Sequence, residues 1–155
     1  MSDLSVYETV EKETKQYIIV KIGGEHYGID ISYIDNIVRL TKITRVPKSP
    51  SYYRGVINLR GEVVPVMSLR RRMGLEDDDF TDKSRIIILK LENAGLVGVI
   101  VDEVKEVLTL SEDDIEEPSS TLRSKNSFIS GVGSNGDELI SIFEISSIIG
   151  ESDAS

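Results

Sequence analysis

The sequence contains no cysteine and no tryptophan, and His26 is its single histidine among 155 residues. Without cysteine there can be no disulfide framework, no thiolate metal site and no cysteine nucleophile. No apolar run approaches the roughly 18 residues that indicate a membrane-spanning helix. The first fifteen residues alternate acidic and polar side chains and lack the apolar core of a signal peptide. We therefore expect a cytoplasmic protein with no direct membrane contact.

Positive charge is also scarce, with 18 Lys and Arg against 27 Asp and Glu and a net charge of −9. Binding to nucleic acid depends on Lys and Arg, so this function class is disfavoured. The basic run Arg70-Arg71-Arg72 is expected to balance neighbouring acids or to meet an acidic partner. The acidic run Glu76-Asp-Asp-Asp79 lacks the ligand spacing of a calcium loop, so we interpret it as a solvated loop and expect no metal site.

Candidate catalytic groups are few. A Ser-His-Asp triad would need His26, which lies beside the Gly23-Gly24 turn with no marked nucleophile nearby. Residues 131–136 spell G-x-G-x-x-G, but a strand rather than a helix is expected after them, which favours a hairpin turn. The sequence therefore predicts neither an enzyme nor a cofactor. A small-barrel enzyme or ligand-binding protein remains an alternative, supported only by acidic clusters such as Glu112-Asp-Asp114.

Short apolar segments separated by glycine turns are abundant, and they predict an all-β protein. The segment 31–38 is ambiguous between a helical turn and an extended run. Short helices are expected at 68–73, ended by Gly74, and at 144–149. Strands are expected at residues 16–22, 26–31, 85–91, 96–101, 104–110, 128–132 and 138–143, with a strand–turn–strand unit at 55–66.

The two halves of the chain repeat one pattern. Gly28 and Gly98 occupy matching places 70 positions apart, and the run Val63–Leu69 matches Leu139–Ile145 at an offset of 76. A duplicated set of four or five short strands predicts two small β-barrels, because closing each sheet removes its exposed edges. One large sandwich with chance similarity is the alternative.

The unit Gly55–Val66 carries Arg60 at its predicted turn, next to apolar strands. Arginine suits a partner contact there because its stem covers apolar area and its planar head offers several donors. An internal salt bridge is an equally good explanation on physical grounds. Pro65 cannot donate to a ladder, so it is expected on an edge strand or at a bulge.

The segment Gly55–Arg70, GVINLRGEVVPVMSLR, resembles the signature of the CheW family, the bacterial chemotaxis coupling proteins. Four further segments resemble landmarks of that family in the same order, and the resemblance covers about residues 16–149. They are Tyr27–Asp30, Ile43–Pro47, Val97–Asp102 and Phe128–Gly131.

The resemblance implies two SH3-like five-stranded β-barrels around a shared apolar core, with short helices in the connections and at the C-terminus. It implies one CheW-like domain at 15–150, whereas the residues themselves predict a flexible acidic leader at 1–14 and a frayed tail at 151–155. The two intertwined barrels would comprise about residues 30–82, and 15–29 with 83–150, with exchange of terminal strands left open.

The implied function is a non-catalytic adaptor that couples the cytoplasmic tips of chemoreceptors to the regulatory domain of the histidine kinase CheA. Such a protein is recruited to receptor arrays at the inner face of the membrane. A detached regulatory barrel that serves another signalling pathway is the alternative within this class.

The residues that match the family's binding positions are binding candidates in this sequence. For several of the apolar residues, a place in the core is a competing explanation. Asn36 and Ser68 depart from the family, which often has acidic residues there, and residues 119–125 match too poorly to place a second kinase contact. The receptor-binding candidates are Arg60, Asn58, Leu59, Ile34, Asn36, Ile37, Ile86, Ile87, Val104 and Val107. The kinase-binding candidates are Val38, Leu40 and Ile43.

Overall fold

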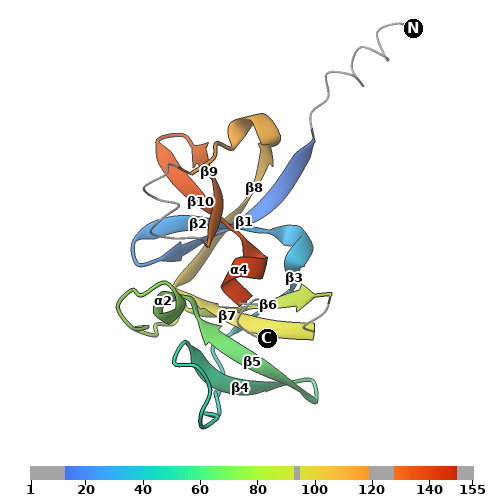
Figure 1. Ribbon diagram of the computed structural model, residues 1–155, viewed down its shortest axis with the longest axis vertical. Coiled ribbons are helices and arrows are strands. Elements are labelled where there is room, and N and C mark those ends of the chain that lie inside the picture. The colour runs from blue at the N-terminus through green and yellow to red at the C-terminus, as the bar shows by residue number, and fades with distance from the viewer. Residues whose placement is uncertain (1–12, 93–94, 119–127, 150–155) are drawn as a thin grey trace, which may run out of the picture.

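The computed structural model describes residues 13–92, 95–118 and 128–149, and it consists mainly of β-strands (Figure 1). The all-β prediction is confirmed. Residues 1–12 of the expected leader, the expected tail and the segment 119–125 lie outside the described residues. The strands are β1 Thr14–Ile22, β2 Glu25–Asp30, β3 Ile34–Arg39, β4 Tyr53–Leu59, β5 Glu62–Ser68, β6 Arg85–Leu91, β7 Gly95–Val101, β8 Glu103–Ser111, β9 Ile129–Asn135 and β10 Glu138–Phe143.

Short helical turns join or end these strands. The 3-10 turn η1, Ile31–Tyr33, precedes β3, so the ambiguous segment 31–38 is first helical and then extended. The helix α2, Leu69–Arg72, follows β5, and α4, Ile145–Ile149, follows β10, both near the expected places. A second 3-10 turn, η2, spans Glu112–Asp114.

The strands form two five-stranded sheets that lie one above the other in Figure 1. Sheet 1 has the order β8-β1-β2-β10-β9, and sheet 2 has the order β3-β6-β7-β5-β4. The chain therefore starts sheet 1, crosses at η1 to build all of sheet 2, and returns after β7 to complete sheet 1. The sheets divide the chain differently from the expected split at residue 82, because β6 and β7 pair within sheet 2 and not with β1 and β2.

The repeat predicted from the sequence is confirmed by the strand registers. In sheet 1, β10 runs parallel to β2 with Ile142 beside Gly28, and in sheet 2, β5 runs parallel to β7 with Val66 beside Gly98. A Cβ at Gly28 would lie 2.9 Å from Ile142, and one at Gly98 would lie 2.8 Å from Ile86. Both glycines are therefore required by close packing at equivalent places in the two sheets.

Three apolar clusters hold the molecule together, because successive side chains of a strand point to opposite faces. On β6, Ile86 and Ile88 face the sheet 2 cluster, whereas Ile87 and Leu89 face the central cluster between the sheets. On β1, Tyr17 and Ile19 face the sheet 1 cluster. The buried members of the central cluster are Ile18, Val20, Ile22, Tyr27, Ile29, Met67, Leu69, Ile87, Leu89, Val99, Val101, Ile129, Phe143, Ile145 and Ile148.

The strand–turn–strand unit at 55–66 is confirmed as the hairpin of β4 and β5. Arg60 and Gly61 both have positive φ, 52° and 85°, which is the geometry of a two-residue hairpin turn whose twist matches the strands. The side chain of Asn58 accepts a hydrogen bond of 3.0 Å from the Gly61 N–H and so fixes the turn.

Pro65 lies on β5, which is an interior strand of sheet 2, so the expectation of an edge strand or bulge was wrong. Its partner on the neighbouring strand β4 is Val56. The N–H and C=O of Val56 both form hydrogen bonds with Thr44, which lies on the side of β4 away from Pro65. The pairing of Pro65 with Val56 therefore needs no backbone N–H from Pro65. On its other side, the parallel pairing of β5 with β7 begins only at Val66.

The fold requires a glycine at position 55, and the sequence patterns did not reveal this. Its φ of 144° is open only to glycine at little strain, and a Cβ there would overlap the carbonyl oxygen of Thr44. The segment around Thr44 crosses β4 at this point through two backbone hydrogen bonds of 2.8 Å to Val56.

We expect Gly55→Ala to lower the free energy of unfolding by about 3 kcal/mol, because it adds both backbone strain and a backbone overlap. Gly61→Ala is the matched control: its φ is also positive, but no atom lies within 4 Å of the added Cβ. The control should lose about 1 kcal/mol, the strain alone. Urea denaturation measures both values, and equal losses would contradict the overlap at Thr44.

Candidate functional site

Arg60 lies at the tip of the β4–β5 hairpin with 70% of its side chain exposed. Its guanidinium lies 3.6 Å from the carboxylate of Asp35 on β3, whose side chain is 28% exposed. Both explanations raised by the sequence therefore have support: an internal ion pair exists, and most of the arginine still faces solvent. A single exposed pair contributes about 0–1 kcal/mol to stability, so this contact orients Arg60 more than it holds the fold.

Asp35 was missed by the sequence interpretation, which considered Asn36 instead. The pairing of β3 with β6 shifts register between Ile34 and Asn36, and such an irregularity cannot be seen in the sequence. Asn36 is half-buried, and its side chain accepts a hydrogen bond of 2.8 Å from the Ile37 N–H. The acidic group near Arg60 is thus provided by the residue before Asn36.

The remaining residues of the hairpin tip differ in exposure. Asn58 is exposed, but its side-chain oxygen is already used to hold the turn. Leu59 is half-buried and packs against the sheet 2 cluster. Of the predicted trio, Arg60 therefore offers the most to a partner.

Apolar candidates on β3 and β8 occupy equivalent edges of the two sheets. Ile34 and Ile37 on β3 and Val104 on β8 are half-buried, and all three pack against the central cluster. Val107, the counterpart of Ile37 at the offset of 70, is 48% exposed. The structure therefore brings Ile34, Ile37 and Val104 to the rim of one core.

Ile86 and Ile87 were expected at the receptor groove, but both are fully buried. Strand β6 pairs with β3 and β7 along its edges, and an apolar cluster covers each of its two faces. These residues are core positions and cannot touch a partner in the folded protein. The continuous apolar run Arg85–Leu91 is the signal of a strand buried on both faces.

The kinase-binding candidates Val38, Leu40 and Ile43 are half-buried and pack against the sheet 2 cluster. Leu40 and Ile43 also line an open depression of about 500 Å³. Its other lining residues are Thr41, Arg45, Arg54 and Phe80.

Asp102 forms a polar junction between the sheets, where the chain passes from β7 to β8. Its carboxylate accepts two hydrogen bonds from the Arg70 guanidinium, of 3.0 and 2.6 Å, and one of 2.9 Å from the Gly23 N–H. Its own N–H donates to the Lys21 carbonyl. Burial opposes ionisation, but the bonds from Arg70 and Gly23 outweigh it, so the pKa of Asp102 lies below its ordinary value.

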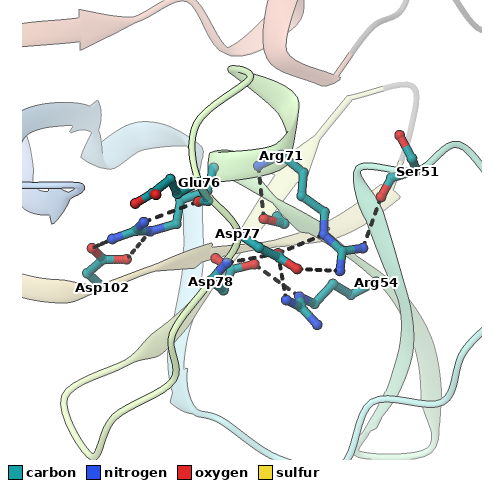
Figure 2. Close-up of polar contacts among 9 residues, drawn as sticks. Ser51, Arg54, Arg71, Glu76, Asp77, Asp78 and Asp102 are labelled. Atoms are coloured by element: carbon teal, nitrogen blue, oxygen red, sulfur yellow. Dashed lines mark hydrogen bonds and ion pairs between the residues drawn. The ribbon is translucent and has the colours of Figure 1, made fainter.

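The acidic run Glu76–Asp79 is solvated only in part: Glu76, Asp77 and Asp79 are exposed, as expected, whereas the Asp78 side chain is buried and two of the carboxylates are paired. Figure 2 shows Asp77 between Arg54 and Arg71, and it accepts hydrogen bonds of 2.8–2.9 Å from both. The side chain of Asp78 is only 2% exposed and bonds to Arg54 at 3.0 Å. The hydrogen bonds from Arg71 hold the pKa of Asp77 well below its usual range.

The basic run at residues 70–72 binds neighbouring groups of the same chain, which agrees with the first of the two predictions made for it. Arg70 bonds to Asp102 and Arg71 to Asp77, while Arg72 donates to the carbonyls of Ile148 and Ser147 at the end of α4. The Arg72 guanidinium also lies over the rings of Tyr52 and Phe128, at 4.4 and 5.0 Å. These contacts tie α2 to the closing helix.

Ser68 has a structural role at the start of α2. It is completely buried, and its hydroxyl accepts a hydrogen bond of 3.1 Å from the Arg71 N–H. Serine and aspartate are both good N-caps, so the departure removes a buried charge and retains the cap of α2.

The glycine-rich motif at 131–136 lies in a hairpin, as expected, and His26 lies beside an acidic side chain. The Nδ1 atom of His26 lies 3.4 Å from the Glu138 carboxylate across β2 and β10. Gly131 and Gly133 lie within β9, and Gly136 forms the turn before β10. Over the described residues, no group of three or more His, Asp or Glu side chains could hold a metal ion. No helix in this part of the chain is long and apolar enough to cross a membrane.

The fold defines a class: β proteins of two five-stranded sheets that share a central apolar cluster. The comparison with known proteins gives the family. A model described as a CheW-like domain matches residues 16–153. The chain therefore belongs to the CheW family, and the resemblance found in the sequence is confirmed.

Individual relatives agree with this assignment. The chain is 34% identical over 138 residues to the chemotaxis protein CheW of Helicobacter pylori, covering 89% of this chain and 83% of the relative. It is 34% identical over 139 residues to the chemotaxis protein CheW of Bacillus subtilis, covering 89% and 88%. The crystal structure of the scaffolding protein TtCheW from Thermoanaerobacter tengcongensis has a TM-score of 0.79 at 32% identity and covers 85% of this chain and 90% of that one.

We expect Asp102→Asn to lower the free energy of unfolding by about 2 kcal/mol at pH 7, because it weakens hydrogen bonds to a charged acceptor. A carboxylate with a lowered folded pKa stabilises fully above its unfolded pKa of about 3.9 and loses this effect as pH falls through the folded value. The difference between wild type and variant should therefore shrink below about pH 4.

Urea denaturation from pH 7 to pH 3 measures this difference, with the exposed Asp79→Asn as control. The control should match wild type within about 0.5 kcal/mol throughout. If the free energy of unfolding of Asp102→Asn stays below that of wild type by the same amount down to pH 3, the Asp102 carboxylate does not stabilise the fold through its charge.

Proposed function

We propose that this protein is a chemotaxis adaptor that binds the cytoplasmic tip of a chemoreceptor and the regulatory domain of the histidine kinase CheA, without catalysis. The observation that carries the proposal is the exposed Arg60, which lies beside Asp35 of β3, the strand that also carries Ile34 and Ile37 at the rim of the central cluster. A receptor tip is a helical hairpin, and an apolar rim with one cationic anchor suits a helix with apolar and acidic side chains. Membership of the CheW family supports the same function.

We further propose that each sheet closes as an SH3-like barrel. In sheet 2, the segment that follows β3 pairs with β4 through Thr44 and Val56, and in sheet 1 the segment that follows β8 pairs with β9 through Glu116 and Val132. Each bridge links the chain that continues from one outer strand of a sheet to the outer strand on the opposite side. The contact between Asp35 and Arg60 supports closure of sheet 2 in the same way.

The kinase would contact the outer side of sheet 2, where Val38, Leu40 and Ile43 lie. The regulatory domain of the kinase has the same double-barrel fold in this family, so pairing between barrels is the expected mode. The protein would act in the cytoplasm, at receptor arrays on the inner face of the membrane.

Co-sedimentation tests the adaptor function. Receptor fragments that contain the tip are sedimented with the kinase, with and without this protein. We expect the kinase to enter the pellet only when the protein is present, because the protein supplies both contacts. Equal recovery of kinase in its absence would refute coupling, and binding to neither partner would favour another signalling pathway.

We expect Arg60→Glu to weaken binding to the receptor fragment by at least tenfold, because it replaces an attraction with a repulsion at the centre of the proposed surface. Its thermal stability should stay close to that of wild type, since the pair with Asp35 is largely exposed. Lys83→Glu makes the same charge change in the exposed loop before β6 and is the control. Isothermal titration measures the affinities, and wild-type affinity of Arg60→Glu would contradict the assignment.

A further inference from the structure

The segment between β3 and β4 encloses two adjoining cavities on sheet 2. One has a volume of about 280 Å³ and the other of about 240 Å³. Both are lined by Val46, Ser49, Pro50 and Tyr53, so they adjoin at these residues and are together called the hollow, with two parts. Neither part includes the proposed receptor-binding residues or the kinase-facing Val38, Leu40 and Ile43.

The larger part is cationic. Its lining includes Arg45, Lys48, Arg54 and Arg71, a concentration of positive charge in a chain whose net charge is −9. Asp77 and Asp78 pair with two of the four cations. Within the described residues, Arg45 and Lys48 have no ion pair, so four positive and two negative groups leave an excess of two positive charges.

The smaller part is apolar. Val56 and Pro65 line it beside the shared residues, and Val46 is 41% exposed, so apolar area is left uncovered there. An apolar slot beside a cationic pocket selects for two properties of a ligand at a defined separation. A free inorganic anion would use only the cationic part.

The hollow is held in shape before any ligand arrives. Hydrogen bonds between Thr44 and Val56 fix one end of the segment, the Ser49 hydroxyl bonds to the Val46 carbonyl at 2.8 Å, and the Tyr53 N–H bonds to the Pro50 carbonyl at 3.0 Å.

Two of the four cations, Arg54 and Arg71, are positioned as well, and they form the wall beside the exposed Arg45 and Lys48. As Figure 2 shows, Arg71 is fixed by Asp77 on one side and by the Ser51 carbonyl on the other, the latter at 3.1 Å. Arg54 is fixed by Asp77 and Asp78 and lies 4.7 Å from the ring centre of Phe80. A preformed site binds a ligand with a smaller loss of conformational entropy than a flexible one.

We propose that this two-part hollow binds a short peptide segment of a partner protein, in which an acidic side chain adjoins an apolar one. The carboxylate would bind between Arg45 and Lys48, and the apolar side chain would lie against Val46, Val56 and Pro65. Arginine and tyrosine are the residues that most often carry affinity at such contacts. This proposal does not depend on the chemotaxis assignment.

The test is an NMR titration of the full chain, labelled with ¹⁵N, using the capped hexapeptide Gly-Glu-Leu-Glu-Phe-Gly. We expect amide shifts concentrated in residues 45–56 and near Arg71. A peptide with Gln in place of Glu, and another with Ser in place of Leu and Phe, should each bind about tenfold more weakly, because each lacks one of the two required properties. Affinity should also fall as salt screens the cations.

Variants locate the site. The double change Arg45→Glu with Lys48→Glu should weaken peptide binding by about tenfold or more. Val46→Ser should weaken it by a smaller factor. Lys42→Glu is the matched control, because Lys42 is exposed in the same connection but lines neither cavity, and its affinity should stay within about twofold of wild type.

Three results would overturn the proposal. The first is a set of shifts outside the hollow, and the second is wild-type affinity in the double variant. The third is displacement of the peptide by an equal concentration of inorganic phosphate, which would make the cationic part a general anion site in which the apolar part has no role.

Discussion

The carboxylate of Asp102 lies where the chain returns from one sheet to the other, and it binds groups from both. The Gly23 N–H comes from the β1–β2 turn of sheet 1, whereas Arg70 comes from α2, directly after strand β5 of sheet 2. The central cluster supplies most of the attraction between the sheets, but apolar burial has little directional preference. Hydrogen bonds do have such a preference, so the junction around Asp102 fixes how the two sheets meet. Arg72 reinforces it by binding the end of α4.

The candidate receptor surface depends on that arrangement because its parts belong to different sheets. Ile34 and Ile37 lie on the outer strand of sheet 2, and Val104 lies on the outer strand of sheet 1. Neither strand alone offers more than a few half-buried side chains. A small rotation of one sheet would separate them, although each sheet could keep its own hydrogen bonds. The junction at Asp102 therefore helps to hold the two parts of this candidate surface in place.

Sequence periodicity predicted the strands well, because glycine turns and apolar runs mark them locally. The repeat at 70 and 76 residues also predicted which strands are equivalent. It could not assign β6 and β7 to a sheet, since pairing between distant strands leaves no local signal. The same limit explains the site: Ile86 and Ile87 look like surface apolar residues by alignment but are covered from both sides, and Asp35 reaches Arg60 only after the sheet curves. The ion pairs of Asp77 and Asp78 were hidden for a similar reason, because Arg54 lies more than 20 positions away.

The two halves share a backbone plan but differ in charge at matching places. Thr44 bridges to Val56 in sheet 2, and Glu116 bridges to Val132 in sheet 1. Arg45 and Lys48 follow the first of these positions, whereas Glu116 and Glu117 occupy the second. The hairpin tips differ likewise, with Arg60 in one and Gly136 in the matching turn. Because packing requires only the shared apolar pattern and the close glycine contacts, surface charge is free to differ between the halves. A duplicated fold can thus present two unlike surfaces to two partners, and an adaptor needs such a difference.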